Sequence, residues 1–414
     1  MSSSPAPRLA HFRVLRPKHS IAQADSFAWL ARAHAVAEHT SSLTRGDAPD
    51  SPHAPASAPA PFDTDAFERR IARALSRFGC PADRIAHRGH AIDDCTHRDF
   101  AKMALYDVTR DPHGADMATR TAFFSAVAED HFRRLYAEDE QPPGEIVHVT
   151  CTGYASPSAA QRLVDARGWG AATRVVHAYH MGCYASLPAV RIACGLSALS
   201  GTLGSARPAA GNPSLPVGPN PRVDIVHTEL CSLHLDPTRH EPEQLVVQSL
   251  FGDGTVRYSV DPTAEHGFDV LALDEQLIPG TDACMSWIPS AFGMRMTLAR
   301  DVPDRIAAAL LPFLERLAAR AGTTLPALRA DGVFAVHPGG PKIVDRVAAL
   351  VDLRAEQVAA SVDVLRRFGN MSSATLPTVW SEIARDPAVP IGTLVASLAF
   401  GPGLTVCGGI FRKV

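Results

Sequence analysis

Close cysteine pairs, long apolar runs and an excess of one charge are all missing from this sequence. The eight cysteines, at positions 80, 95, 151, 183, 194, 231, 284 and 407, form no CxxC pair, which argues against zinc ribbons and disulfide scaffolds and favours a reducing cytoplasm. No apolar run is long enough to cross a bilayer, and residues 1–20 lack the apolar segment of a secretory signal. The net charge of −3 gives no electrostatic case for nucleic acid or an anionic membrane as the main partner. The histidines also lack metal-ligand spacing, so we expect no metal site.

Apolar residues, in contrast, make up 46% of the 414 residues, which suits a globular protein with a large core. The length fits two ordinary domains or one large duplicated fold. Residues 45–61 and 200–222 are rich in Pro, Ser, Gly and Ala. Such stretches bury too little surface to offset their ordering entropy, so we predict two flexible insertions.

The stretch 175–186 predicts a buried strand, a tight turn and the start of a helix. Gly182 permits the turn, and apolar residues recur at helical spacing over 187–196. Cys183 should therefore lie at a strand-to-helix elbow, near unpaired N–H groups that stabilise a thiolate. A lone cysteine is more often a small buried apolar residue, so its role depends on what lies around it.

Two further polar side chains follow predicted elements. A buried strand over 333–336 ends at His337, and a helix ends at Gly369, just before Asn370. Each residue alone is commonly a core histidine or a turn residue. Together with Cys183 they supply an imidazole that can hold a thiolate as an ion pair and two donors for an enolate oxygen. We therefore expect a Cys183 pKa of roughly 3.5–7.5, with the thiolate present near neutral pH.

The alternation of elements predicts the class of fold. Strand and helix patterns alternate over 146–196, which predicts βαβ units and an α/β fold with a parallel sheet. A strand over 256–260 is expected to begin the sheet of the second half. Residues 84–100 are locally basic. They form either a solvated loop or, through Arg88, a contact to the phosphates of a nucleotide-bearing substrate.

Several short motifs resemble those of the chalcone synthase-like, type III polyketide synthases, in the same order. They are Met181–Ala185, Leu250–Gly254, His337–Pro341, Gly369–Ala374 and Phe400–Thr405. The resemblance runs from about residue 140 to the C-terminus. Any one of these motifs is weak, whereas the ordered set is specific and identifies the chain as a bacterial-type member.

The resemblance implies the thiolase fold, a duplicated α-β-α-β-α arrangement of five layers in a homodimer. Residues 1–255 would form the half that carries the nucleophilic Cys183, and residues 256–414 the half that carries His337 and Asn370. Cys183 would take the starter acyl group from an acyl-CoA. His337 and Asn370 would direct decarboxylation of malonyl-CoA and stabilise the enolate.

The resemblance also implies substrate-binding residues. Phe251 falls where the family keeps a phenylalanine between the CoA tunnel and the cavity, and Met296 where it keeps a second one. Cys151 and Cys231 fall where family members shape the initiation cavity, and Ser372 lies in the motif that contains the catalytic asparagine. These small or flexible side chains predict a channel for medium or long fatty acyl starters. The expected products are alkyl-resorcinols, alkyl-pyrones or related polyketides.

Two other interpretations remain open at this point. One is a single-condensation β-ketoacyl synthase III-like enzyme that uses carrier-protein substrates. The other is an inactive thiolase-fold subunit, against which the intact Cys183, His337 and Asn370 count. The favoured interpretation needs acyl-CoA and malonyl-CoA as substrates and no cofactor. It also places a homodimer in the cytoplasm.

Overall fold

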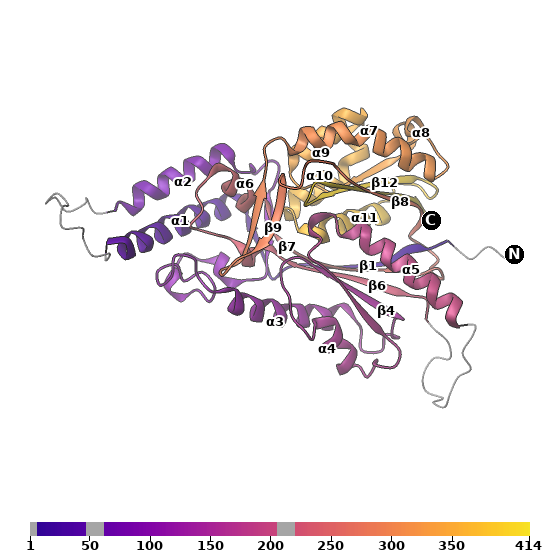
Figure 1. Cartoon of the computed structure of the whole chain (residues 1–414), viewed down its shortest axis with the longest axis horizontal. Coiled ribbons are helices and arrows are strands. Elements are labelled where there is room, and N and C mark those ends of the chain that lie inside the picture. Colours follow the sequence, from indigo (N-terminus) through magenta and orange to yellow (C-terminus); the bar gives the residue numbers. More distant parts are fainter. Residues whose placement is uncertain (1–5, 47–61, 205–219) are drawn as a thin grey trace.

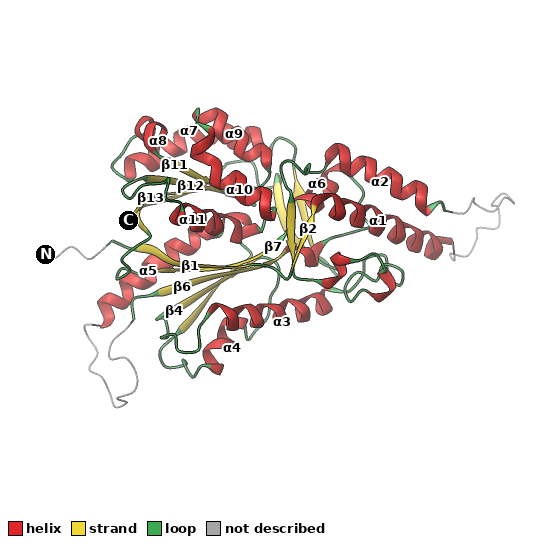
Figure 2. Cartoon of the chain, turned by 180° about the vertical axis from the view of Figure 1, so that it is seen from behind, coloured by secondary structure: helices red, strands yellow, loops and turns green. Residues whose placement is uncertain are grey.

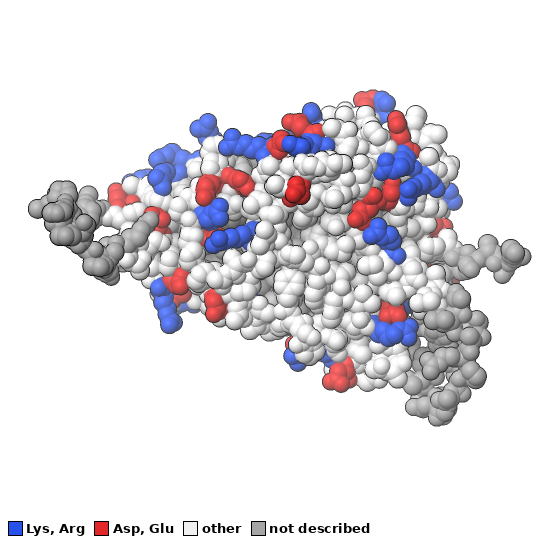
Figure 3. Space-filling view, viewed as in Figure 1, with Lys and Arg blue, Asp and Glu red and all other residues white. Residues whose placement is uncertain are grey.

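The computed structural model describes residues 6–46, 62–204 and 220–414. It has an α/β fold, as the sequence predicts. The expected flexible insertions at 45–61 and 200–222 fall mostly outside the described residues. In the part of the chain that is described, no helix is long and apolar enough to cross a membrane. On the face shown in Figure 3, both signs of charge are interspersed along the upper edge.

One nine-stranded sheet runs through the whole molecule (Figures 1 and 2). Its strands, in spatial order, are β11 (Val333–Val336), β12 (Leu394–Gly401), β13 (Thr405–Lys413), β8 (Phe268–Leu277), β1 (Arg8–Leu15), β7 (Asp253–Val260), β6 (Val223–Leu230), β4 (Glu145–Thr150) and β5 (Arg174–Tyr179). The β4–β5, β4–β6 and β11–β12 pairs are parallel, and the others are antiparallel.

The two expected halves meet at β1, which pairs with β7 on one side and β8 on the other. The expected boundary at 255/256 falls within β7, and this strand pairs with β6 and β1 of the first half. The prediction that residues 256–260 begin the second sheet is therefore wrong. The pattern of apolar residues in a strand does not reveal which neighbouring strand it will pair with.

Eleven helices in the described residues cover this sheet. They are α1 (Gln23–Gly46), α2 (Thr64–Phe78), α3 (Met117–Leu135), α4 (Ala159–Ala166), α5 (Ser186–Gly204), α6 (Pro242–Leu250), α7 (Val302–Arg320), α8 (Leu325–Asp331), α9 (Pro341–Val351), α10 (Ala359–Phe368) and α11 (Thr375–Arg385). Strands β11, β12, β13 and β8 form one arm of the sheet, and β7, β6, β4 and β5 form the other, with β1 between them. Helices α5 and α11 lie between these two arms, and each contacts strands of both. Helices α3 and α4 cover one outer face, and α7 to α9 cover the other (Figure 1). The expected five layers are thus confirmed.

The middle layer is apolar and fully buried, which fixes the ends of the elements that carry the site. Ala189 and Val190 of α5 and Leu376 and Trp380 of α11 are fully buried in one apolar cluster. Burial of this kind contributes roughly 1.5–3 kcal/mol for each large apolar side chain. The starts of both helices are therefore anchored in the same apolar cluster.

Two small elements stand beside the sheet. The hairpin of β9 (Met285–Pro289) and β10 (Met294–Leu298) lies near α6, and β2 (His19–Ala22) pairs with β3 (His87–His90). Helices α1, α2 and α6 pack together at the end of the molecule next to them (Figure 1). This corner, where the hairpin meets the ends of the sheet strands, encloses the cavity described below.

Candidate active site

Cys183 lies at the predicted elbow. Strand β5 ends at Tyr179, a 3₁₀ turn covers Gly182–Tyr184, and α5 begins at Ser186. Gly182 has a φ of 74°, a left-handed conformation that glycine adopts freely. A Cβ atom at this position would also lie 2.8 Å from Cδ of Pro402. Glycine is therefore required for the turn that presents the thiol.

His337 follows β11, and its backbone N–H donates to the carbonyl oxygen of Leu398 at 2.7 Å. Its imidazole is 1% exposed, and within the described residues neither ring nitrogen has a hydrogen-bond partner. The loop that follows is joined to Asn370, whose Nδ2 donates to the carbonyl oxygen of Gly339 at 3.3 Å. The histidine loop and the asparagine loop thus meet, as the sequence interpretation requires.

Asn370 is also joined to the neighbourhood of Cys183. Its Oδ1 accepts a 2.9 Å hydrogen bond from the backbone N–H of Ser372. The Ser372 hydroxyl oxygen accepts from the Cys183 thiol, with Sγ and Oγ 3.8 Å apart. Asn370 further exchanges backbone hydrogen bonds with the loop of Phe251, through Leu250 and Gly252 at 2.9 Å each. Ser372 is therefore linked to Cys183, and Asn370 joins Ser372 to the loop of Phe251.

The expected thiolate is not what this geometry stabilises. Burial raises the pKa of the Cys183 thiol to about 12, although hydrogen bonds from Ser372 and Asn370 oppose the shift. Burial likewise lowers the pKa of His337 to about 3. Near neutral pH the empty site therefore holds a neutral thiol and a neutral imidazole. The expected pKa of roughly 3.5–7.5 rested on the helix N-terminus and an ion pair with His337, and it did not include the desolvation of these two side chains.

The cavity in front of Cys183 is small and mostly apolar, with a volume of about 60 Å³. Ligand pockets for drug-sized molecules are typically roughly 300–1,000 Å³. Its lining includes most of the predicted binding residues, namely Cys151, Cys231, Phe251, Met296 and Ser372. Burial raises the pKa of Cys151 and Cys231 well above that of an ordinary thiol, so both are neutral, polarisable walls.

Trp287 forms a wall that the sequence interpretation missed. It lies on β9, directly across the hairpin from Met296. Its indole Nε1 donates a 2.7 Å hydrogen bond to the carbonyl oxygen of Cys151. Its ring meets the ring of His234 edge-on, with centroids 5.6 Å apart and planes at 86°. A tryptophan nine positions before Met296, in a strand-turn-strand pattern, was the signal available in the sequence.

His234 is itself fixed, so the wall is preorganised. Its Nε2 donates to the carbonyl oxygen of Thr152 at 2.8 Å, and its Nδ1 accepts from the backbone N–H of Met294 at 3.2 Å. Burial lowers its pKa to about 3, so the ring is neutral and both nitrogens are used. Trp287 therefore packs against a side chain that cannot turn away without losing two hydrogen bonds.

Glu229, at the end of β6, is a second residue that was missed. It is fully buried, and desolvation raises the pKa of its carboxyl above the ordinary value. It accepts hydrogen bonds from the backbone N–H of Cys151 at 3.1 Å, from the Thr152 hydroxyl at 2.9 Å and from the Ser373 hydroxyl. A carboxylate near the end of a strand predicted to be buried was the signal available in the sequence.

Arg88 requires a correction. The structure buries its side chain, which is 1% exposed, below the loop of Phe251. The guanidinium donates to the carbonyl oxygens of Gln248 at 2.8 Å and Phe251 at 2.9 Å, and to Gln23 Oε1 at 2.9 Å. Arg88 thus holds the Phe251 loop in place and does not face solvent, where the phosphates of a CoA would lie. A locally basic sequence does not reveal which of its side chains turns inward.

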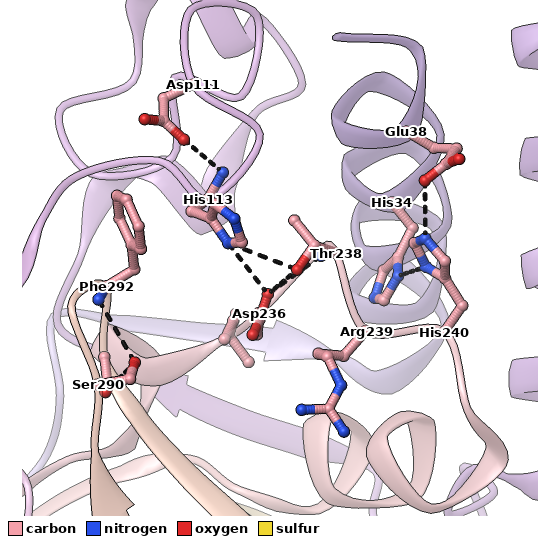
Figure 4. A network of polar contacts seen from close by, with 12 residues as sticks. His34, Glu38, Asp111, His113, Asp236, Thr238, Arg239, His240, Ser290 and Phe292 are labelled. Atoms are coloured by element: carbon pink, nitrogen blue, oxygen red, sulfur yellow. Dashed lines mark hydrogen bonds and ion pairs between the residues drawn. The ribbon is translucent and has the colours of Figure 1, made fainter. Parts of the chain in front are cut away.

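A polar part of the cavity lining is joined to the tip of the β9–β10 hairpin (Figure 4). Asp236 and Arg239 belong to the cavity lining, and Figure 4 shows the polar network beside them. The imidazole of His113 lies 3.8 Å from the carboxylate of Asp236 and 3.4 Å from the hydroxyl of Thr238. The same ring stacks on Phe292 at the hairpin tip, with centroids 4.5 Å apart. The loop before α3 therefore braces the hairpin that carries Trp287.

Comparison with known proteins shows related sequences. Residues 270–414 match the family described as chalcone and stilbene synthases, C-terminal domain. Type III polyketide synthase C of Arabidopsis thaliana is 29% identical over 278 residues, which cover 65% of this chain and 67% of that protein. The 1,3,6,8-tetrahydroxynaphthalene synthase of Streptomyces griseus is 27% identical over 276 residues, which cover 66% and 68%. Probable polyketide synthase 1 of Dictyostelium discoideum is 29% identical over 275 residues, and that match spans only 8% of its length.

Solved structures share the fold over the whole chain. The polyketide synthase PKS-I of the brown alga Ectocarpus siliculosus has a TM-score of 0.73 and 19% identity, with 100% of both chains covered. The 1,3,6,8-tetrahydroxynaphthalene synthase of Streptomyces coelicolor A3(2), a bacterial type III polyketide synthase, has a TM-score of 0.71 and 21% identity, with 98% and 99% covered. These likenesses confirm the thiolase fold that the motifs imply.

Proposed function

The chain belongs to the chalcone synthase-like type III polyketide synthases, and we propose that it acts as a decarboxylating condensing acyltransferase of that family. The observation that carries the proposal is the position of Cys183. Its thiol lies on a required glycine turn at the base of an apolar cavity, with Ser372 and Asn370 beside it. An inactive subunit would not need this arrangement.

The residues divide the proposed reaction between them. Cys183 attacks the thioester carbon of an acyl-CoA, forms the acyl–sulfur bond and releases CoA. Malonyl-CoA then loses carbon dioxide, and the electron pair of the broken bond forms an enolate that attacks the acyl carbon. A neutral imidazole carries one N–H, so His337 can donate to the enolate oxygen, and the amide of Asn370 can supply a second donor. The electron pair comes from malonyl-CoA, so the proposal requires no cofactor.

The cavity volume bears on the starter. The sequence favours medium or long acyl chains, but a cavity of about 60 Å³, lined by Cys183 and Trp287, leaves little space for them. We therefore propose short acyl starters, with cyclisation to a short-chain alkyl-resorcinol or alkyl-pyrone. A second candidate product follows from the same observation. With malonyl-CoA as starter, the product would be of the kind named for the tetrahydroxynaphthalene synthase relatives.

Turnover with defined substrates tests this proposal. Purified protein is incubated with malonyl-CoA alone, or with malonyl-CoA and acyl-CoA starters from acetyl to dodecanoyl, and products are identified by mass spectrometry. We expect polyketides of more than one extension, made from short starters, and none from Cys183→Ala. Parallel reactions with malonyl and acyl carrier proteins test the single-condensation alternative. A β-ketoacyl product formed only from carrier proteins would contradict the proposal.

The proposed assembly is a homodimer formed through β5. This strand lies at the edge of the sheet and carries the half-buried side chains of Val175 and Val176. Edge strands present unpaired backbone groups that a second copy can pair with about a two-fold axis. Sedimentation should show a dimer that Val176→Lys weakens, and a monomeric wild type would contradict this assembly. The cytoplasmic location stays a prediction.

A further inference from the structure

A buried arginine in the first turn of α3 joins several loops around the cavity. The side chain of Arg120 is 1% exposed. Its guanidinium donates to the carbonyl oxygens of Ala115 at 2.7 Å and His113 at 2.8 Å. It also donates to the carbonyl oxygen of Leu233 and to the hydroxyl of Tyr106, the latter at 3.1 Å. All these acceptors are uncharged, so the contacts hold backbone segments together and do not neutralise an acid.

Tyr106 completes this junction. Its hydroxyl donates to the carbonyl oxygen of Ser232 at 2.6 Å and accepts from the backbone N–H of Leu235 at 3.0 Å. Together with the hydrogen bond from Arg120, this uses the one donor and both acceptor positions of the hydroxyl. Arg120 and Tyr106, which we call the Arg120 clamp, therefore hold the backbone of residues 232–235 at three points.

The segment that the Arg120 clamp holds carries one wall of the cavity. The 3₁₀ turn Cys231–His234 follows β6, and both Cys231 and His234 line the cavity. Hydrogen bonds within a 3₁₀ turn have poor geometry, so contacts from outside largely decide where such a turn lies. Burial lowers the pKa of His234 to about 3, and the charge of Arg120 acts in the same direction. The wall is therefore uncharged, and the clamp fixes its position.

The β9–β10 hairpin forms a second wall, and the start of α3 holds this wall as well. The backbone N–H of Met117 donates at 2.8 Å to the carbonyl oxygen of Ala291 at the hairpin tip. The ring of His113, whose carbonyl oxygen accepts from Arg120, stacks on Phe292 of the same tip, with centroids 4.5 Å apart (Figure 4). Both walls are thus fastened to the first turn of α3, where Arg120 lies.

We propose that the Arg120 clamp sets the distance between these two walls and thereby limits the length of the starter acyl group that fits beside Cys183. The choice of starter rests on the proposed function. The walls also touch each other, through the rings of His234 and Trp287 and the 3.2 Å hydrogen bond from Met294 to His234. The rigid fork of a guanidinium keeps both walls in the places that these contacts require. Both residues of the clamp are positioning residues, because neither lines the cavity in the described chain.

Alkylation of Cys183 by reagents of two sizes tests the clamp without any substrate. N-methylmaleimide and N-phenylmaleimide react with the same thiol, so the ratio of their rates cancels any change in thiol reactivity. Peptide mass spectrometry assigns the adducts to Cys183, and glutathione gives the ratio for an unrestricted thiol. In the wild type the large-to-small ratio should lie well below that reference. In Arg120→Lys it should rise about tenfold or more, because lysine lacks the fork and one hydrogen bond to a charged group is worth at least that factor.

Matched variants separate positioning from a general loss of stability. Tyr106→Phe removes only the hydroxyl and should also raise the ratio, and its effect should not add fully to that of Arg120→Lys, because both act on one junction. Arg257→Lys is the control, since Arg257 is also buried but donates to the carbonyl oxygen of Leu135 at the other end of α3. It should lower the free energy of unfolding in urea and leave the ratio unchanged. Circular dichroism checks that each variant is folded, and Tyr106→Phe carries the test if Arg120→Lys is not.

The same variants are then given octanoyl-CoA and butyryl-CoA in competition, with malonyl-CoA. The octanoyl-to-butyryl ratio of kcat/KM should rise in both clamp variants and keep the wild-type value in Arg257→Lys. A wild-type alkylation ratio in both clamp variants, or an equal rise in Arg257→Lys, would overturn the clamp. An unchanged starter ratio beside a raised alkylation ratio would overturn its link to starter length. Because alkylation needs no polyketide formation, a raised alkylation ratio in a protein that makes no polyketide would contradict only the proposed function.

Discussion

Replacing Trp287 with glycine should open the cavity and shift starter selection toward longer acyl chains. The indole closes one side of a space of about 60 Å³, against the fixed ring of His234. Glycine removes the ring and its 2.7 Å hydrogen bond to the Cys151 carbonyl. That carbonyl keeps a second donor, the Tyr154 hydroxyl at 3.2 Å, so the acceptor is not left unpaired. The main effect should therefore be on volume and not on folding.

The size of the shift follows from the apolar surface that a longer chain would bury. Each methylene gains about 0.8 kcal/mol on burial, which is about a fourfold change in rate or affinity. Octanoyl-CoA and butyryl-CoA differ by four methylenes, so the limit is about 3 kcal/mol, or about 200-fold in kcat/KM. In the wild type these methylenes find no space, and the octanoyl-to-butyryl ratio should be one or less.

The assay is a competition between the two starters in the presence of malonyl-CoA, with both products counted by mass spectrometry. Trp287→Phe is the control, because it keeps an aromatic ring in the cavity wall and removes the indole N–H with only part of the ring volume. It should give a ratio within a few-fold of the wild type, whereas Trp287→Gly should raise the ratio by at least about tenfold, well inside the burial limit. An unchanged ratio in Trp287→Gly would refute the reasoning that Trp287 limits the cavity.

Three further predictions follow from burial and backbone geometry. Without substrate, the Cys183 thiol should ionise only well above pH 9, since burial raises its pKa to about 12. The measurement is the ultraviolet absorbance of the thiolate as a function of pH, with Cys183→Ser as the reference. A titration midpoint near or below that of a free thiol would contradict this prediction. Gly182→Ala should lower the free energy of unfolding, measured in urea, by roughly 1–2 kcal/mol or more, because a left-handed backbone is unfavourable for alanine and the new Cβ would meet Pro402. If the variant is as stable as the wild type, the turn does not require a glycine. Five buried histidines have pKa values lowered to about 3, namely His34, His148, His227, His234 and His337. In the unfolded chain these histidines bind protons below about pH 6.5, whereas in the folded chain they stay neutral until about pH 3. The free energy of unfolding should therefore be constant above about pH 6.5 and fall as the pH decreases toward about 3, by at most about 7 kcal/mol per pH unit. A urea midpoint that does not change between these two pH values would contradict this prediction.

Local signals account for what the sequence predicted well. The elbow of Cys183 needs only a strand, a glycine turn and a helix period, which lie within a short stretch. His337 follows the end of β11, and Asn370 follows the end of α10. The loops after these two elements meet through the hydrogen bond from Asn370 to Gly339. The ordered motifs then imply one arrangement of layers, which the structure confirms.

What was missed depends on contacts between distant segments. Trp287 limits the cavity because the hairpin register places it opposite Met296, and hairpin register is not visible in composition. Arg88 turns inward because the carbonyl oxygens of Gln248 in α6 and of Phe251 just after it accept hydrogen bonds from its guanidinium. The protonation of Cys183 reflects desolvation summed over its folded surroundings. Each of these outcomes is a property of the packed molecule and not of any short segment.

The most direct test of the central claim is to locate the acyl group. The wild-type protein is incubated briefly with a short acyl-CoA, digested and mapped by mass spectrometry, with Cys183→Ala treated in the same way. The account predicts one acyl thioester, on Cys183, that disappears from the wild type when malonyl-CoA is added and polyketide is formed. An acyl group on Cys151 or Cys231, or polyketide formation by Cys183→Ala, would contradict it.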